Sequence, residues 1–276
     1  MRSEAGTSRP RSSAAPIAAA VGCVLLLALA PSGSANSHGR YPGSDPVENG
    51  ANPCATPERK QLLCPNLRMS RPSNLFISTS SGGRRLLHAQ SSVNSRGKGP
   101  MEIRGIRIPG TNLMRVNQRI HRRGGGKLVI QTQGRLAFYP VPGQYRYWKF
   151  RDAARFEIWT VDRHHDPKAQ IRTGPKFYYC LRDLERTKPS RHSPGHRVYP
   201  GCNQNPNERG VTLGTSVGWS DIYPADYNAQ YVDVSGLHGC FAFYMEADPK
   251  NHLCELNEND NRSRVLVRLS LGYVGC

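Results

Sequence analysis

Residues 255–261, with the sequence ELNENDN, place a carboxylate or amide oxygen at every position but one. Calcium takes oxygen ligands of this kind and needs six to eight of them. The stretch therefore predicts a calcium site. A plain polar turn before the last strand is the alternative.

A second stretch with a marked chemistry is the basic segment 184–202, LERTKPSRHSPGHRVYPGC, in a chain of net charge +18. Such a charge favours anionic partners, for example cell-wall polymer, polysaccharide or lipid head groups. Loops carry function more often than frameworks do, so this predicted loop is our expected anion-binding surface. No sequence-specific nucleic-acid partner is predicted, and a solvated basic surface is the alternative. The expected contact residues are Arg182, Arg186, Lys188, Arg191 and Arg197.

β-strands must position these stretches. Strand-like segments lie at 75–77, 86–93, 101–104, 114–120, 127–132 and 265–271, with glycine-rich turns between several of them. Their near-regular spacing predicts an all-β fold, an antiparallel β-sandwich. No run of helical periodicity follows residue 35. Residues 230–234 and 241–245 are expected to be a strand and its return across a turn at 236–239.

The stretch 213–261 carries a motif that identifies a family. In order and spacing it resembles the catalytic domain of the lysyl oxidases, copper-dependent amine oxidases, and the likeness extends over about residues 62–271. The matching residues are Gly214, Ser216, Gly218, Trp219, Asp221, Tyr223, Gln230, Asp233, Asp248 and Pro249.

The resemblance implies a lysine–tyrosine cofactor. Residues 174–183, GPKFYYCLRD, match the family segment whose lysine joins a tyrosine to form a quinone, and these positions are Lys176 and Tyr223. In the family, copper and oxygen form the quinone, which then takes the substrate amine as a Schiff base. Asp221 or Asp183 would be the base that removes a proton from the substrate.

The copper motif is where the chain departs from the family. Family members carry three histidines at a spacing of two on a strand, so that three imidazoles point to one face. The corresponding positions hold Tyr145, Tyr147 and Lys149. A protonated ammonium group cannot bind a metal, and the other histidines show no convergent spacing. Copper and the quinone are therefore doubtful cofactors for this chain.

The resemblance also gives the calcium prediction a ligand set. Family members pair an acidic cluster with the start of the domain. The residues at those offsets are Asn66, the carbonyl of Leu67, Glu255, Asn257, Asp260 and Asn261.

Seven cysteines follow residue 35, so in an exported chain one would be free or paired between chains. We predict the pairs Cys54–Cys64, Cys180–Cys202 and Cys240–Cys254, which leave Cys276 alone.

Export is predicted by residues 1–35, where arginines precede an apolar run. A single N-terminal membrane anchor is the alternative. Residues 36–61 are expected to be a disordered lead-in, and 62–276 the lysyl oxidase-like domain.

Two functions follow. The first is a secreted, degenerate member that has lost copper-dependent amine oxidation and binds anionic extracellular polymer. The alternative is an active copper/quinone oxidoreductase that oxidises primary amines with O2, as a protein-lysine 6-oxidase does. The positive charge would repel a lysine-rich substrate at long range.

Overall fold

The computed structural model describes residues 52–269 and Cys276, so the predicted signal segment 1–35 lies outside the described residues. Regular structure in the described part is β-strand apart from one 3-10 helix, η1 (Pro57–Lys60). No helix in this part is long and apolar enough to cross a membrane. The strands are β1 (Leu62–Leu63), β2 (Leu67–Met69), β3 (Ser73–Thr79), β4 (Arg85–Ser95), β5 (Met101–Arg107), β6 (Leu113–Arg122), β7 (Lys127–Pro140), β8 (Arg146–Phe150), β9 (Ala154–Val161), β10 (Pro167–Thr173), β11 (Gly210–Thr215), β12 (Ser220–Tyr223), β13 (Tyr231–Asp233), β14 (Gly239–Ala247) and β15 (Arg262–Leu269).

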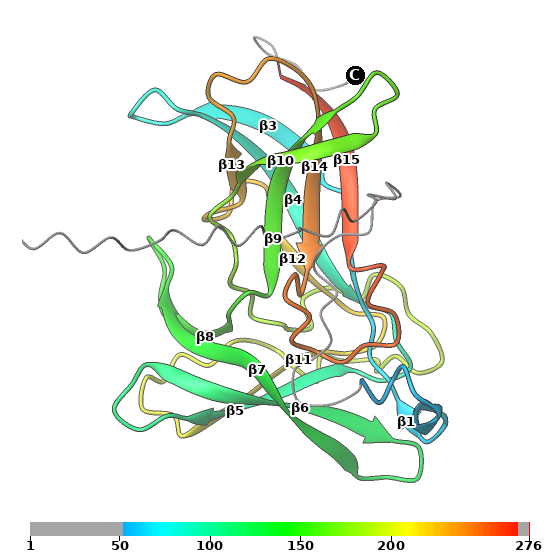
Figure 1. Cartoon of the computed structure of the whole chain (residues 1–276). Helices are drawn as coiled ribbons and strands as arrows, with labels where there is room; N and C mark the ends of the chain where they lie inside the picture. The colour runs from blue at the N-terminus through cyan, green and yellow to red at the C-terminus, as the bar shows by residue number, and fades with distance from the viewer. Residues whose placement is uncertain (1–51, 270–275) are drawn as a thin grey trace, which may run out of the picture. The chain divides into compact units, whose positions relative to one another are not determined.

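The strands form three antiparallel sheets, which confirms the predicted all-β class. The first has the order β11-β5-β6-β7-β8, with β1 beside β6, and it forms the lower part of the view in Figure 1. The second has the order β10-β9-β14-β15. In the third, β4 pairs with β12, β13, β2 and β3.

One apolar core joins the three sheets. Its large buried side chains include Ile103 from β5, Trp148 from β8, Phe156 from β9 and Phe243 from β14. Alternation along each strand sends these residues inward and polar neighbours outward. The core thereby fixes the ends of β8 and β12, which carry the functional residues described below.

The predicted strand and return at 230–245 is wrong as a hairpin. β13 pairs with β4, whereas β14 pairs with β9 and β15. Both segments are strands as expected, but they belong to different sheets. An alternating pattern gives the face that a strand buries and does not give its partner.

Residues 52–61, the end of the predicted lead-in, are folded. Cys54 forms a disulfide with Cys64, and the Asn52 side chain donates to the Glu255 carbonyl at 2.9 Å and to Glu258 at 2.8 Å. The segment therefore belongs to the domain, because a covalent link and long-range hydrogen bonds tie it down.

The disulfides correct one predicted pair. Cys54–Cys64 and Cys180–Cys202 form as expected, but Cys240 pairs with Cys276 and Cys254 is free. Cys240 lies at the start of β14 and Cys254 beyond its end. A strand rises about 3.3 Å per residue, so the length of β14 separates the two cysteines.

We expect Cys254 to be inert in the native protein. Burial, with help from the nearby Glu258, Asp248 and Glu255, raises the pKa of its thiol to about 12, and the thiolate is the reactive form. Iodoacetamide at pH 8 should leave it unmodified until the protein is unfolded.

Non-reducing peptide mapping should show Cys240 linked to Cys276. A Cys240–Cys254 peptide would contradict the pairing.

Candidate functional site

The structure brings Lys176 and Tyr223 into contact, as the family resemblance implies. The Lys176 Nζ lies 4.2 Å from the centre of the Tyr223 ring, and both residues are buried. Tyr223 ends β12, which pairs with β4. Lys176 begins a segment that runs antiparallel to the end of β8 through a bridge between Tyr179 and Phe150.

Two more tyrosines surround the amine. The Lys176 Nζ lies 4.6 Å from the Tyr227 ring centre and 5.1 Å from that of Tyr179. Both rings meet Tyr223 edge to face. The amine also donates to the Asn228 carbonyl at 3.5 Å. Aromatic faces attract a cation, so this cage holds the lysine in place.

Asp221 anchors the other side of Tyr223. It is fully buried, its Oδ2 accepts from the Leu181 N–H at 3.2 Å, and its Oδ1 lies 3.4 Å from Arg182 Nε. Burial raises the pKa of Asp221 to about 6, although Arg182 opposes this shift. The Tyr223 hydroxyl accepts from the Cys180 N–H at 3.0 Å. Asp221 can therefore hold or release a proton near neutral pH, beside a fixed phenol.

Lys149, which the sequence placed at the third position of the family's copper motif, joins this group. It projects from β8, is buried, and its Nζ lies 5.6 Å from the Tyr227 ring centre and 5.7 Å from that of Tyr147. Burial lowers the pKa of Lys149 to about 8, while Asp221 acts in the opposite direction. Burial and the charge of Lys149 lower the pKa of Lys176 to about 7. Two lysines therefore share one cage.

These residues do not fit a copper ion. Where the family has three convergent imidazoles, Tyr145 is 71% exposed, Tyr147 is half-buried and Lys149 is a buried amine. Copper(II) favours imidazole ligands. In the part of the chain that the structure describes, no three His, Cys, Asp or Glu side chains are placed to hold a metal ion.

Asp183, the second predicted base, forms hydrogen bonds with the basic loop and with Ser216. Its oxygens accept from Val198 N–H at 2.8 Å, Tyr199 N–H at 3.2 Å, Ser216 N–H at 2.6 Å and the Ser216 hydroxyl at 2.8 Å. Asp183 is fully buried. With both oxygens engaged, it fastens the basic loop to the Ser216 turn.

The family motif around Gly218 also holds the basic loop. Trp219 donates from its indole N–H to the Pro194 carbonyl at 3.1 Å. Gly218 has a φ of +80°, and a Cβ there would lie 2.7 Å from the Lys188 carbonyl. Only glycine fits this close approach. The motif thus presents the loop against the start of β12.

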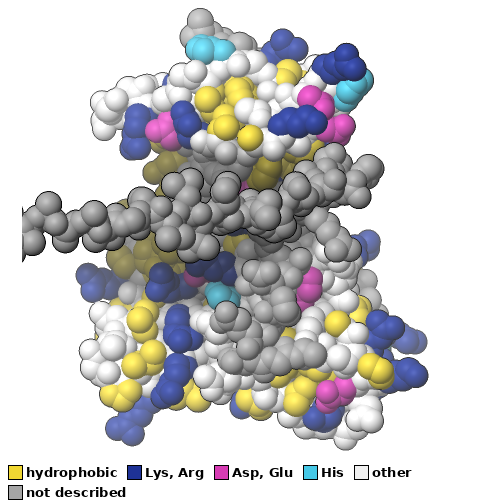
Figure 2. Space-filling model, in the orientation of Figure 1, with side chains coloured by type: hydrophobic (Ala, Val, Ile, Leu, Met, Phe, Trp, Pro, Cys, Tyr) yellow, Lys and Arg dark blue, Asp and Glu magenta, His cyan; other side chains and the backbone are white. Residues whose placement is uncertain are grey.

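The loop leaves most of its predicted anion-binding residues in solvent. Arg186, Lys188, Arg191 and Arg197 are exposed, but Arg182 is half-buried beside Asp221. Figure 2 shows further Lys and Arg side chains on the visible face of the first sheet, in the lower part of the view.

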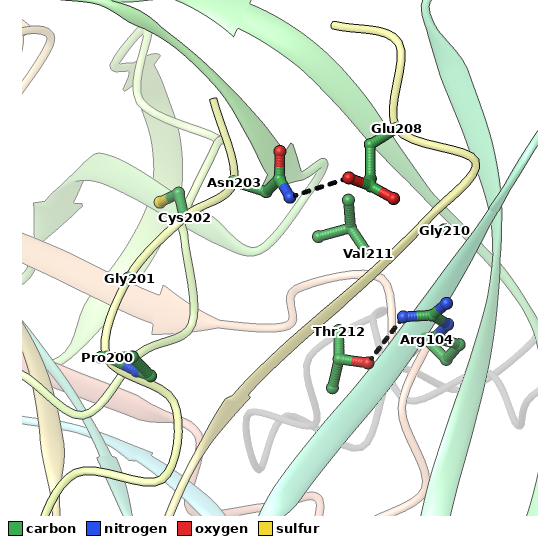
Figure 3. A pocket seen from close by; sticks show the side chains of 9 residues that line it. All are labelled: Arg104, Pro200, Gly201, Cys202, Asn203, Glu208, Gly210, Val211 and Thr212. Carbon is green, nitrogen blue, oxygen red and sulfur yellow. Dashed lines mark hydrogen bonds between the residues drawn. The ribbon is translucent and has the colours of Figure 1, made fainter. Parts of the chain in front are cut away.

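An open hollow of about 740 Å³ lies at the end of this loop, and sequence reasoning missed it. Figure 3 shows Arg104 donating to Thr212 and Asn203 donating to Glu208 across it. Its residues come from β5, from β11 and from the segment 200–208, so no local pattern could have pointed to it.

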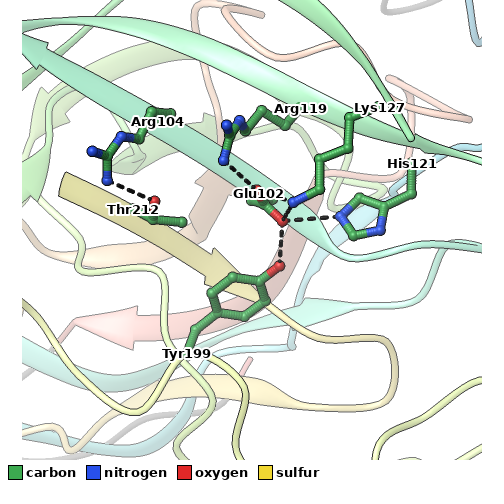
Figure 4. Close-up of polar contacts among 7 residues, drawn as sticks. All are labelled: Glu102, Arg104, Arg119, His121, Lys127, Tyr199 and Thr212. Carbon is green, nitrogen blue, oxygen red and sulfur yellow. Dashed lines mark hydrogen bonds and ion pairs between the residues drawn. The ribbon is translucent and has the colours of Figure 1, made fainter. Parts of the chain in front are cut away.

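Glu102 ties the same loop to the first sheet (Figure 4). Its side chain is buried and accepts from Arg119, Lys127 and the Tyr199 hydroxyl, with His121 at 2.9 Å. The lysine bond is 2.7 Å and the tyrosine bond 2.8 Å. This carboxylate joins β5, β6, β7 and Tyr199, beyond the reach of a sequence pattern.

The six predicted calcium residues lie together. The Asn66 side chain contacts Asp260 and the Asn257 N–H, and Glu255 accepts from Asn261. Leu67 contributes its N–H to Glu255. Arg68 lies 2.5 Å from Asp260 and already neutralises it.

Two buried oxygens in this cluster have no donor, Glu258 Oε2 and Asn261 Oδ1. Burial and neighbouring carboxylates raise the pKa of Glu255, and burial raises that of Glu258 to about 8. Unpaired acceptors beside buried carboxyl groups fit a hard cation. Glu255, Glu258 and Asn261 are therefore the residues that would hold calcium, and Glu258 was absent from the predicted set.

We expect calcium to stabilise the domain through this cluster. At ten times its Kd, a ligand of the folded state adds about 1.4 kcal/mol, or roughly 3–5 °C in Tm. Thermal melts with calcium and with magnesium would measure this. The same calcium shift in Glu258→Gln as in wild type would contradict the assignment.

A sequence model of the lysyl oxidase family matches residues 97–274, which is more than half of the chain. No curated protein matches the sequence. The match covers Lys176, Tyr223 and Asp221 as well as the substituted strand β8. The chain belongs to the lysyl oxidase family.

Proposed function

We propose that this lysyl oxidase-family protein is a secreted, non-catalytic member that binds anionic extracellular polymer through its basic loop. The observation that carries the non-catalytic part is the buried Lys149 at the third copper-ligand position. An amine beside Lys176, with a half-buried and an exposed tyrosine at the other two positions, supplies no imidazole set. Without the metal, oxidation of the tyrosine lacks its usual agent.

The charge distribution supports polymer binding. The sequence carries a net charge of +18, and Arg186, Lys188, Arg191 and Arg197 are exposed on one loop. The Cys180–Cys202 disulfide closes that loop, and Asp183 and Trp219 fasten it. A basic surface on a fixed backbone loses little entropy when it binds a polyanion.

The alternative function is amine oxidation with a copper/quinone centre. The 4.2 Å contact between Lys176 Nζ and the Tyr223 ring favours it, because these are the two precursors of the family's cofactor. Calcium at the Glu255 cluster is compatible with either function.

Metal analysis and a quinone stain, both on protein purified in excess copper, distinguish the non-catalytic function from amine oxidation. The proposal predicts no stoichiometric copper, no quinone and no hydrogen peroxide from primary amines. One copper per chain, with a quinone signal that Tyr223→Phe removes, would establish the oxidase instead.

Retention on a heparin column tests polymer binding. We expect wild type to elute at high salt, because exposed charges attract over about 10 Å at 0.1 M ionic strength and less as salt rises. Glutamine at Arg186, Lys188, Arg191 and Arg197 should abolish retention at 0.1 M NaCl. The matched control removes four exposed charges elsewhere, at Arg71, Lys98, Arg163 and Arg172. Equal losses in the two variants would show that net charge alone binds the polymer.

A further inference from the structure

Arginines gather on the outer face of the first sheet, and two of them have no carboxylate partner in the described part of the chain. Arg104 of β5 is half-buried, and its guanidinium donates to the Thr212 hydroxyl at 3.1 Å. Arg209, directly before β11, is exposed. Arg119 of β6 pairs with Glu102. Like charges placed close together repel each other, so an anion bound between them would stabilise this surface.

The register of the strands puts these side chains on one face. Arg104 lies opposite Asn117 of β6 and opposite Thr212 of β11. Arg119 is two residues beyond Asn117 and lies opposite Val129 of β7. Since alternate residues of a strand point to the same side of the sheet, all of them share the outer face. Figure 4 shows Arg104 and Arg119 in this arrangement, with Thr212 beside Arg104.

A hollow of about 420 Å³ lies over this face, and its volume is in the range of small-ligand sites. It adjoins the hollow of about 740 Å³ beside Cys202, because Arg104, Glu208 and Gly210 line both. The two hollows together form an open groove from β7 across β6 and β5 to the end of the basic loop. A groove of this kind suits an extended ligand better than a single ion.

We infer that this groove binds an acidic oligosaccharide, whose sugar rings carry carboxylate or sulfate groups. Arg104, Arg119 and Arg209 line it, and a guanidinium group can donate two parallel hydrogen bonds to one such acidic group. Gly210 lets the Arg104 side chain lie against the backbone, since a Cβ there would be 2.6 Å from the Arg104 Nη2. A guanidinium that is held in place loses little entropy when it binds.

The other lining residues fit the neutral parts of a sugar. Glu208 accepts from Asn203 and Asn205, both at 3.5 Å and through one oxygen, Oε2. Its Oε1 has no donor among the described residues and can accept from a sugar hydroxyl. Ile106 and Val129 are 48% and 55% exposed beside the arginines, where they can contact the C–H groups of a sugar ring.

The lining also argues against two other occupants. Single-stranded nucleic acid binds with its bases stacked on aromatic side chains, and none of the described residues that line the groove is aromatic. A second copy of the chain would bring like charges together at this face, which is unfavourable. The inference rests on the proposed polymer binding and deepens it, because it adds a second contact and names the sugar units.

Calorimetric titration with tetrasaccharides tests the groove. At 0.1 M NaCl we expect wild type to bind a galacturonate or a heparin tetrasaccharide and not neutral maltotetraose. Binding of heparin alone would assign the groove to sulfate groups. Arg104→Gln combined with Arg209→Gln should weaken binding about ten-fold or more, because charge-assisted hydrogen bonds are lost. Arg163→Gln combined with Arg172→Gln removes the same charge at exposed positions and should weaken binding less than about two-fold.

Thermal melts check that both double variants are folded. Equal losses in the two variants would overturn the inference. Equally tight binding of an oligothymidylate of the same charge would overturn it as well, because the surface would then be an unselective basic one.

The same variants distinguish this groove from the basic loop. If wild type is retained on heparin but binds neither acidic tetrasaccharide, the groove alone is rejected. If the glutamine variant of the basic loop is still retained and the Arg104 and Arg209 variant is not, the role of the loop alone is rejected.

Discussion

Asp183→Ala is expected to destabilise the domain by about 4 kcal/mol, since bonds to a charged acceptor contribute about 1.5–3 kcal/mol each and buried donors would remain unpaired. Asp183 is fully buried and accepts four hydrogen bonds, from Val198, Tyr199 and Ser216. In a domain of this size the loss corresponds to roughly 8–16 °C in Tm. Urea unfolding and thermal melts measure both quantities.

The same substitution should release the basic loop. Trypsin is expected to cut after Arg191 or Arg197 at concentrations that leave wild type intact, because local opening exposes the backbone. Asp226→Ala, at an exposed carboxylate, is the control and should change stability by less than about 0.5 kcal/mol. Similar melting points for the two variants would show that Asp183 does not fasten the loop.

Glu102→Gln is expected to destabilise the domain by about 3 kcal/mol at pH 7, the lower end for breaking a buried ion pair. Burial alone would raise the pKa of Glu102, but hydrogen bonds from His121, Lys127 and Tyr199 outweigh it and lower the pKa to about 2. The folded pKa lies below the ordinary value of 4.5. The contribution is therefore complete above about pH 4.5 and is lost as pH falls toward 2.

The pH dependence of the stability difference separates the effect of the Glu102 charge from the effect of its packing. The difference in unfolding free energy between wild type and Glu102→Gln should shrink between pH 7 and pH 3, measured by urea unfolding at each pH. Glu185→Gln, at an exposed site, should follow wild type throughout. A pH-independent difference would show that packing, not the charge of Glu102, carries the effect.

The local sequence pattern predicted most of the strands, but it did not predict which strands pair with each other. The segments 86–93, 101–104 and 114–120 lie within β4, β5 and β6, because each alternates apolar and polar residues. The same alternation at 230–245 could not show that a sheet boundary separates β13 from β14. Cys254 was mispaired for a related reason, since the length of β14 is invisible in a cysteine count.

The candidate site shows the same contrast between what a sequence motif predicts and what only the folded structure reveals. Lys176 and Tyr223 could be placed together because a family motif fixes each of them. The position of Glu102 depends on contacts between distant strands, where no spacing rule applies. The hydrogen bond from the Leu67 N–H to Glu255 likewise joins residues far apart in the sequence. A sequence shows which groups are present and leaves open which of their atoms face each other.

The burial of Lys149 has a consequence for how the protein matures. The resemblance to copper-dependent enzymes implies that in those relatives the metal ion supplies positive charge beside the tyrosine. Here an amine of the chain itself faces Asp221 and Arg182 across that space. Under the proposed copper-free function, the positive charge near Tyr223 is therefore encoded in the polypeptide itself, and folding alone would complete the site without a supply of metal.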